Sequence, residues 1–372
     1  MPTVSACQPD SSASLFLTLA PDVTMPALLS VATWPNGAER AIRNRATHLR
    51  AARYTGYGSA EFVQIVDVDK PVPKDDEVLL KVRAASVNPL ESHLLYAPLP
   101  LRIFTGLRAP KDPRPGADVA GEVEAVGARV TSFKRGDRVF GFCRGAFAEY
   151  ACASESKLAA APENVTFEQA ASLPVAALTA LQALRDKGHV QHGQKVLING
   201  ASGGVGTFAV QIARSFGAEV TGVCSAKNAE LVHSIGADHV IDYARVDFTK
   251  LGERYDVLLD CVANHSLFAY RRVLNPGGKY IAIGLLGSSL AAFLAKAVTG
   301  PLLSRFVSQK FSALVAKGNS KDLAELAKMV SLGKIRPVID RRYSLTEVPD
   351  AVSYLASHRV CGKLIIAVDS GS

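Results

Sequence analysis

The sequence predicts an α/β fold in which a doubly wound parallel sheet is inserted between β-rich segments. Three observations predict it. First, residues 195–224 read as strand, glycine turn, helix and strand. Second, strands and helices then alternate until about residue 284, which is typical of a parallel sheet covered by helices. Third, short strand-like segments with glycine turns precede this region, and residues 335–368 return to that pattern.

Length and composition are those of a two-domain globular protein. The chain has 372 residues and 48% hydrophobic content, enough for large cores. Its net charge of +8 is scattered, so nucleic acid is not expected as a partner. The six cysteines form no C-x-x-C pair, which indicates neither a zinc lobe nor a disulfide framework and fits a reducing, cytoplasmic compartment. No apolar run is long enough to span a membrane.

The first 51 residues differ in texture from the rest. They are rich in Ser, Ala, Pro and Thr and contain no lysine. Asp10, Asp22 and Glu39 disfavour a transit peptide, and the stretch lacks the charged start of a secretory signal. We interpret residues 1–51 as a disordered extension or as the result of a start codon assigned too far upstream, with the first domain beginning at Ala52.

The β-rich region follows, and its strands are predicted from alternating apolar residues. They cover residues 61–68, 77–83, 118–126, 138–142 and 146–153. Near Phe167 the period becomes helical, in FEQAASLPVAALTALQAL. Thr179 lies in this helix, and we expect it near the nicotinamide end of a bound cofactor.

The central unit predicts a dinucleotide site. A buried strand over 196–198 leads into the glycine-rich run NGASGGVG (199–206), and a helix follows that ends at Gly217. Glycines let the backbone approach a pyrophosphate, and the helix N-terminus offers free N–H groups to it. The spacing departs from G-x-G-x-x-G, so a purely structural turn is the alternative. The residues expected to contact the pyrophosphate are Ser202, Gly203, Gly204 and Val205.

The end of the next strand, 220–224, indicates which dinucleotide binds. An NAD site usually has Asp or Glu about 20 residues after the glycines. This chain has Ser225 and Lys227 there and no carboxylate, and a hydroxyl with a cation suits a 2′-phosphate. NADPH is therefore favoured over NADH. The alternative is that Lys227 is a solvated residue at the start of the next helix.

Later strands are predicted at 239–242, 255–261 and 279–283, with a helix at 322–332. Tyr243 closes the first of these strands and would flank the adenosine. Cys261 and Val262 end the second, where their backbone would border the nicotinamide ribose. The Cys261 thiol is interpreted as a small apolar filler, since no paired histidine is evident.

The stretch 285–315 is apolar but interrupted by charged residues, glycine and proline. It is too interrupted to span a bilayer. A lid over the substrate cleft or a subunit contact is favoured, and a peripheral, amphipathic contact with a membrane surface is the alternative.

Several motifs together resemble one family. They are PGADVAGEVEAVG (115–127), GDRVFG (136–141), NGASGGVG (199–206), NPGGKYIAIG (275–284) and GKIRPVID (333–340). In this order they resemble the zinc-free, quinone oxidoreductase-like branch of the medium-chain dehydrogenase/reductase superfamily, over roughly residues 52–369. The resemblance implies a GroES-like catalytic domain formed by 52–175 and 313–372, and a Rossmann NADP-binding domain at 176–312. It also implies a homodimer and quinone or enone substrates.

Zinc ligands of the related alcohol dehydrogenases are missing. Those relatives carry a catalytic cysteine where this chain has Asn88 and a histidine where it has Ala117. Without these ligands no metal is expected to polarise an alcohol. Hydride transfer from NADPH to a quinone or an α,β-unsaturated carbonyl is the chemistry that remains.

Catalytic side chains are few. We expect the Asn88 amide to hydrogen-bond a substrate carbonyl, with a plain turn residue before Pro89 as the alternative. His93, about where relatives have a tyrosine, would donate a hydrogen bond or proton to the reduced acceptor, with a structural histidine as the alternative. Tyr96 is a further candidate. Two other functions stay open: an NADPH-binding sensor or scaffold with little turnover, and an enoyl-thioester reductase.

Overall fold

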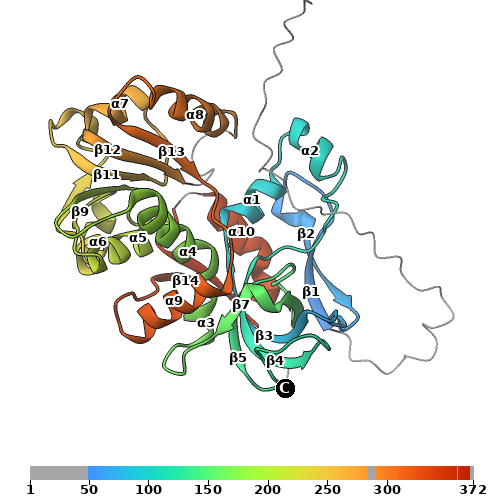
Figure 1. Cartoon of the computed structure of the whole chain (residues 1–372). Helices are drawn as coiled ribbons and strands as arrows, with labels where there is room; N and C mark the ends of the chain where they lie inside the picture. Colours follow the sequence, from blue (N-terminus) through green and yellow to red (C-terminus); the bar gives the residue numbers. More distant parts are fainter. Residues whose placement is uncertain (1–48, 284–289, 358, 369–372) are drawn as a thin grey trace, which may run out of the picture. The chain divides into compact units, whose positions relative to one another are not determined.

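The computed structural model describes residues 49–283, 290–357 and 359–368 (Figure 1). Most of the predicted extension therefore lies outside the described residues. Its last three residues do not belong to an extension, because β1 (Leu49–Tyr54) begins at Leu49 and pairs antiparallel with β2 (Val63–Val68). Residues 49–51, predicted as extension, therefore belong to the first domain.

A mostly antiparallel sheet of seven strands forms the β-rich part, in the order β14-β15-β3-β4-β5-β7, with β6 also pairing β3. Its strands are β3 (Glu77–Val87), β4 (Asp118–Val126), β5 (Arg138–Phe142), β6 (Tyr150–Ser154), β7 (Leu158–Ala160), β14 (Ile339–Ser344) and β15 (Lys363–Ala367). Strand β3 runs four residues further than predicted, because its last residues are buried between β15 and β4. This register sets Ser86 opposite Asp118 and Val87 opposite Leu364, which brings the two ends of the domain together.

A parallel sheet of six strands forms the second part, in the order β10-β9-β8-β11-β12-β13. Its strands are β8 (Lys195–Asn199), β9 (Glu219–Cys224), β10 (His239–Asp242), β11 (Tyr255–Asp260), β12 (Leu274–Ile283) and β13 (Lys310–Leu314). The strand order reverses direction at β8, between β9 and β11, which is where doubly wound sheets bind ligands. The predicted fold class is confirmed.

Helices cover both faces of the parallel sheet (Figure 1). Side chains alternate between the faces. Leu197 and Tyr280 pack with Tyr270 of α7 on one face, and Val196 and Ile198 pack with α4 and α5 on the other. The helices of this part are α4 (Pro174–Gln182), α5 (Gly204–Ser215), α6 (Ala229–Ser234), α7 (Leu267–Arg272) and α8 (Leu290–Leu303).

The apolar stretch 285–315 contains one strand that was not predicted, and for the rest of it the lid or subunit contact stays a prediction. Residues 284–289 lie outside the described residues. Helix α8 follows them, and residues 310–314 form β13, an edge strand parallel to β12. The prediction missed this strand because KFSAL is too short to alternate clearly. None of the described helices is long and apolar enough to cross a membrane.

Two helical segments connect the sheets. The predicted single helix from Phe167 is divided into α3 (Phe167–Ala171) and α4, because Pro174 starts a new helix, and α4 continues into a π-helical turn, Ala183–Gly188. The chain returns through α9 (Ser320–Ser331). The remaining helices of the β-rich part are α1 (Pro89–Leu95), α2 (Leu99–Thr105) and α10 (Val348–Ala356).

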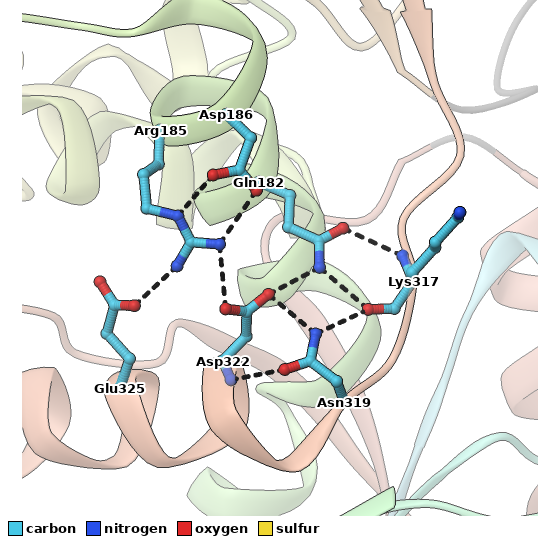
Figure 2. Close-up of polar contacts among 7 residues, drawn as sticks. All are labelled: Gln182, Arg185, Asp186, Lys317, Asn319, Asp322 and Glu325. Atoms are coloured by element: carbon cyan, nitrogen blue, oxygen red, sulfur yellow. Dashed lines mark hydrogen bonds and ion pairs between the residues drawn. The ribbon is translucent and has the colours of Figure 1, made fainter.

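A polar network ties the outgoing and returning segments together (Figure 2). The Gln182 amide donates to Asp322 (2.7 Å) and to the Lys317 carbonyl (2.9 Å), and it accepts from the Lys317 N–H (3.0 Å). Arg185 forms ion pairs with Asp322 (2.9 Å) and Glu325 (2.6 Å). These contacts fix the end of α4 against α9.

Candidate active site

The glycine-rich loop lies between β8 and α5, at the point where the strand order reverses. Gly200 has φ +88°, and a Cβ at Gly206 would lie 2.1 Å from the Gly200 carbonyl oxygen, so the turn admits only glycine at both positions. The cap residue of α5, Gly203, offers no side chain to the first N–H groups of this 12-residue helix. Ser202, Gly203, Gly204 and Val205 are half-buried here. The loop fits the pyrophosphate of a dinucleotide.

The residues predicted for the adenosine side gather at the ends of β9 and β10. The Tyr243 N–H donates to the Cys224 carbonyl (3.1 Å), directly beside Ser225. Lys227 and Tyr243 are exposed. The amide of Asn228, which was not predicted, donates to Ser202 Oγ (3.0 Å) and joins this segment to the glycine-rich loop.

A buried carboxylate organises the end of β11. Asp260 is fully buried and accepts hydrogen bonds from the Asn199 amide (2.8 Å), the Ala263 N–H (2.8 Å) and the Tyr280 hydroxyl (2.8 Å). It thereby holds the turn that contains Cys261 and Val262, where Ala263 has φ +61°. The sequence located this turn but not the bonds that hold it.

Two other predicted residues have internal roles. Burial raises the pKa of the Cys261 thiol, in keeping with a filler rather than a nucleophile. The Thr179 hydroxyl donates to the Val175 carbonyl within α4 (2.6 Å). Whether either residue contacts a cofactor stays a prediction.

A buried polar network lies at the end of β3, around the predicted residue Asn88. Asp118 accepts from the Ser86 hydroxyl (2.6 Å) and the Asn88 amide (2.9 Å) on Oδ2, and from the Val175 N–H (3.0 Å) on Oδ1. The Lys363 ammonium donates to Asn88 Oδ1 (2.6 Å) and lies 3.5 Å from Asp118 Oδ2.

This network corrects the prediction for Asn88. Its side chain is 2% exposed, and both ends of the amide are engaged by Asp118 and Lys363. In this arrangement the amide nitrogen donates to Asp118 and to the Ser86 carbonyl (3.3 Å), which leaves it no further N–H group for a substrate carbonyl. Asp118 and Lys363 were not predicted as partners of Asn88, although a lysine at the start of the apolar run GKLII is unusual enough to indicate a buried charge.

Titration of the network follows from its burial. Burial lowers the pKa of Lys363, and the neighbouring carboxylates Asp118 and Glu91 oppose this effect. Burial likewise raises the pKa of Glu91 to about 7, although the Asn88 N–H donates to its Oε2 (2.7 Å). The network therefore holds a proton that titrates near neutral pH.

His93 and Tyr96 lie on and just after α1, the helix that follows Asn88. His93 is half-buried and Tyr96 is 41% exposed. Close by in the sequence, α2 exposes Leu99, Ile103 and Phe104. The roles of His93 and Tyr96 stay predictions.

The residues at this position do not fit a zinc ion. The oxygen of Asn88 that would face a metal accepts from the Lys363 ammonium, and an ammonium would repel a divalent cation. Among the residues that the structure describes, no three His, Cys, Asp or Glu side chains gather as a metal site. No chemistry at this site is therefore derived from a metal.

A glycine-rich loop at the reversal point of a doubly wound sheet, with a β-rich domain beside it, defines a two-domain dinucleotide-binding protein. Two protein-family models match the chain: "Alcohol dehydrogenase GroES-like domain" over residues 74–163 and "Zinc-binding dehydrogenase" over residues 235–366.

Named relatives cover most of the chain. It is 34% identical over 337 residues to the chloroplast envelope quinone oxidoreductase homolog of Arabidopsis thaliana, covering 86% of this chain and 98% of that protein. It is 34% identical over 335 residues to the 2-methylene-furan-3-one reductase of Solanum lycopersicum, covering 86% and 79%. The solved quinone oxidoreductase from Coxiella burnetii superposes with a TM-score of 0.77 at 29% identity, covering 87% of this chain and 100% of that one.

The chain belongs to the medium-chain dehydrogenase/reductase superfamily, among the quinone oxidoreductase homologues, and is an oxidoreductase. Membership implies a nicotinamide cofactor.

Proposed function

We propose that the protein is a zinc-independent, NADPH-dependent reductase that transfers hydride to a quinone or an α,β-unsaturated carbonyl. The observation that carries the proposal is the Lys363 ammonium bonded to Asn88, which leaves a metal no donor set on the acceptor side. Without a Lewis acid, an alcohol is a poor substrate, whereas quinones and enones already carry an electron-poor carbon. The names of the Solanum lycopersicum and Arabidopsis thaliana relatives agree with such acceptors.

Residues of the parallel-sheet part would hold the cofactor. The N-terminus of α5 and the loop 200–206 would bind the pyrophosphate. Ser225 and Lys227 would bind the 2′-phosphate, since the nearest carboxylate on the next strand, Asp242, accepts from the Ala244 N–H (3.1 Å) and lies 3.7 Å from Arg245. When bound, NADPH supplies the hydride.

The protein's part in the reaction is orientation. The turn held by Asp260 shapes the nicotinamide end of the site, and the network around Asp118 fixes the end of β3 on the acceptor side. Holding two reactants in contact accounts for most of the rate in such reactions. His93 or solvent then supplies the proton to the reduced acceptor.

Chelator-treated protein tests the proposal. NADPH oxidation is followed with a quinone, a short enone and an enoyl-CoA in parallel, and each assay is repeated with NADH. Metal-independent turnover with NADPH preferred is the expected result, fastest with the quinone or the enone. Faster turnover with the enoyl-CoA would instead identify an enoyl-thioester reductase. Binding of NADPH without turnover on any acceptor would favour a sensor or scaffold.

Assembly and location are proposed separately. We propose a cytoplasmic homodimer, supported by the family and by β13, which has a strand partner on one side only among the described residues. Light scattering tests the dimer. The exposed apolar side chains of α2 are the surface we would examine for a peripheral membrane contact, by sedimentation with lipid vesicles.

A further inference from the structure

The start of β15 touches both halves of the candidate site. The Gly362 N–H donates to the Ser202 carbonyl in the glycine-rich loop (2.9 Å). A Cβ placed on Gly204 would lie 3.3 Å from the Gly362 carbonyl oxygen and 3.3 Å from Lys363 Cδ. The stem of the Lys363 side chain therefore passes directly along the first residue of α5.

The other end of the same side chain reaches the acceptor side. The Lys363 ammonium donates to Asn88 Oδ1 (2.6 Å) and to the Val87 carbonyl (3.3 Å) at the end of β3. Lys363 is only 3% exposed. One buried residue thus spans from the cofactor loop to the end of β3.

Stability alone does not account for a lysine here. Removing an ammonium from water costs several kcal/mol, and replacing a buried ion pair by apolar side chains is often neutral or stabilising. The carboxylates that face Lys363 are Asp118 and, more distantly, Glu91. Unlike an apolar side chain, a hydrogen-bonded ammonium fixes the direction and distance of its partners.

We infer that Lys363 is a positioning residue: it holds the end of β3 at a fixed distance from the glycine-rich loop and so sets the geometry between acceptor and cofactor. The inference rests on the proposed function of the site. It differs from charge compensation, in which Lys363 would only neutralise Asp118. The two roles separate when both charges are removed together.

The experiment compares Lys363→Met, Asp118→Asn and the double variant Lys363→Met/Asp118→Asn with the wild type. Lys279→Met is the matched control. The Lys279 ammonium also donates to a backbone carbonyl, that of Gly188 (2.7 Å), but Lys279 lies on β12 and outside this network. The single variant Lys363→Met leaves Asp118 unpaired and is expected to lose stability. The double variant has no unpaired charge, but Asp118→Asn turns an –NH₂ group toward the Ser86 and Asn88 donors, so the double variant is compared with Asp118→Asn alone.

The readouts are kcat, the NADPH dissociation constant and the kinetic isotope effect with deuterated NADPH. A loosening of about 1 Å lowers rates about 10²-fold, so the double variant is expected to lose about 10²-fold in kcat relative to Asp118→Asn, with a larger isotope effect. Its NADPH dissociation constant is expected to stay within about threefold of the wild-type value, less than 1 kcal/mol. Lys279→Met should match the wild type. A double variant whose kcat equals or exceeds that of Asp118→Asn, with no larger isotope effect, would overturn the inference in favour of charge compensation.

A readout without turnover separates this inference from the proposed function. NADPH is expected to slow hydrogen exchange in residues 84–95 of the wild type and to do so much less in the double variant. Absence of turnover in the wild type would refute the proposed function, and exchange would still decide on Lys363. Equal protection in both proteins, or none in the wild type, would overturn the inference.

Discussion

Substitution of Asp322 provides a quantitative test of the network that joins α4 to α9 (Figure 2). Its buried carboxylate accepts from Gln182 (2.7 Å) and Asn319 (2.9 Å) and pairs with Arg185 (2.9 Å). The substitution Asp322→Asn keeps the size of the side chain but turns an –NH₂ group toward these donors. Because a buried donor then lacks an acceptor, we expect a clear loss of stability.

The magnitude follows from the lost bonds. Hydrogen bonds to charged groups contribute roughly 1.5–3 kcal/mol each, and Asn keeps one acceptor oxygen, so the expected loss is about 2–4 kcal/mol. The entropy of unfolding is about 2.1 cal/mol/K per residue, so for 372 residues each kcal/mol corresponds to roughly 1.3 °C, and Tm should fall by about 3–5 °C. Asp186→Asn is the control, since Asp186 also bonds Arg185 (2.6 Å) but its side chain is 47% exposed. Exposed pairs contribute about 0–1 kcal/mol, so this control should lower Tm by about 1 °C or less.

The assay is thermal and urea unfolding of the three proteins between pH 3 and pH 7. Burial alone would raise the pKa of Asp322, but the bonds from Gln182, Asn319 and Arg185 outweigh it and hold the pKa below its usual value. Its contribution is therefore present above the unfolded-state pKa, about 3.9, and is lost as the pH falls through the folded-state pKa. The difference between wild type and Asp322→Asn should be largest at pH 7 and shrink in acid. Equal effects of Asp322→Asn and Asp186→Asn, or a difference that grows in acid, would refute the reasoning.

Three further predictions concern the site. Lys227→Glu should raise KM for NADPH at least about tenfold and shift preference toward NADH, because the 2′-phosphate loses an ion pair worth about 1.4 kcal/mol or more. Steady-state kinetics with both cofactors check this, and an unchanged preference would mean that Lys227 is merely solvated. Gly206→Ala should weaken NADPH binding about 10²-fold in a fluorescence titration, because its Cβ would lie 2.1 Å from the Gly200 carbonyl oxygen; unaltered affinity would contradict a pyrophosphate at this turn. Glu91→Gln should flatten the pH dependence of the free energy of unfolding. Burial raises the pKa of Glu91 to about 7, so between about pH 5 and about pH 7 the folded wild type keeps a proton that the unfolded chain releases, and its free energy of unfolding falls as the pH rises. If urea titrations gave both proteins the same change of this free energy with pH, the prediction would be wrong.

Sequence pattern located most strands because burial imposes periodicity on them. The predicted strands at 118–126, 138–142 and 239–242 have the observed bounds. Elements whose existence depends on a distant neighbour were missed. Strand β13 forms because β12 offers it a parallel edge, and α1, a seven-residue helix, forms where it packs against α10.

In the candidate site, too, local features could be predicted and long-range contacts could not. The glycine-rich loop could be located because it is a local motif, and its chemistry is set by adjacent residues. The pairing of Asp118 with Lys363 joins residues 245 positions apart and depends on the registers of β15 and β4 against β3. No local pattern contains that register. For the same reason Asn88 could be located at the end of a strand, whereas the hydrogen bonds of its amide to Asp118 and Lys363 could not be predicted.

The charge of the acceptor side bears on the kind of substrate that it can take. Lys363 and Asp118 oppose each other at 3.5 Å, and burial raises the pKa of Glu91 to about 7, so this carboxyl carries little charge in mildly acidic solution. A network of near-zero net charge gives no strong attraction for an anionic substrate and no metal-like centre for an alkoxide. Quinones and enones are uncharged and already electron-poor, so they require orientation more than electrostatic activation. Lys363, which we propose holds the end of β3 at a fixed distance from the glycine-rich loop, would meet that requirement.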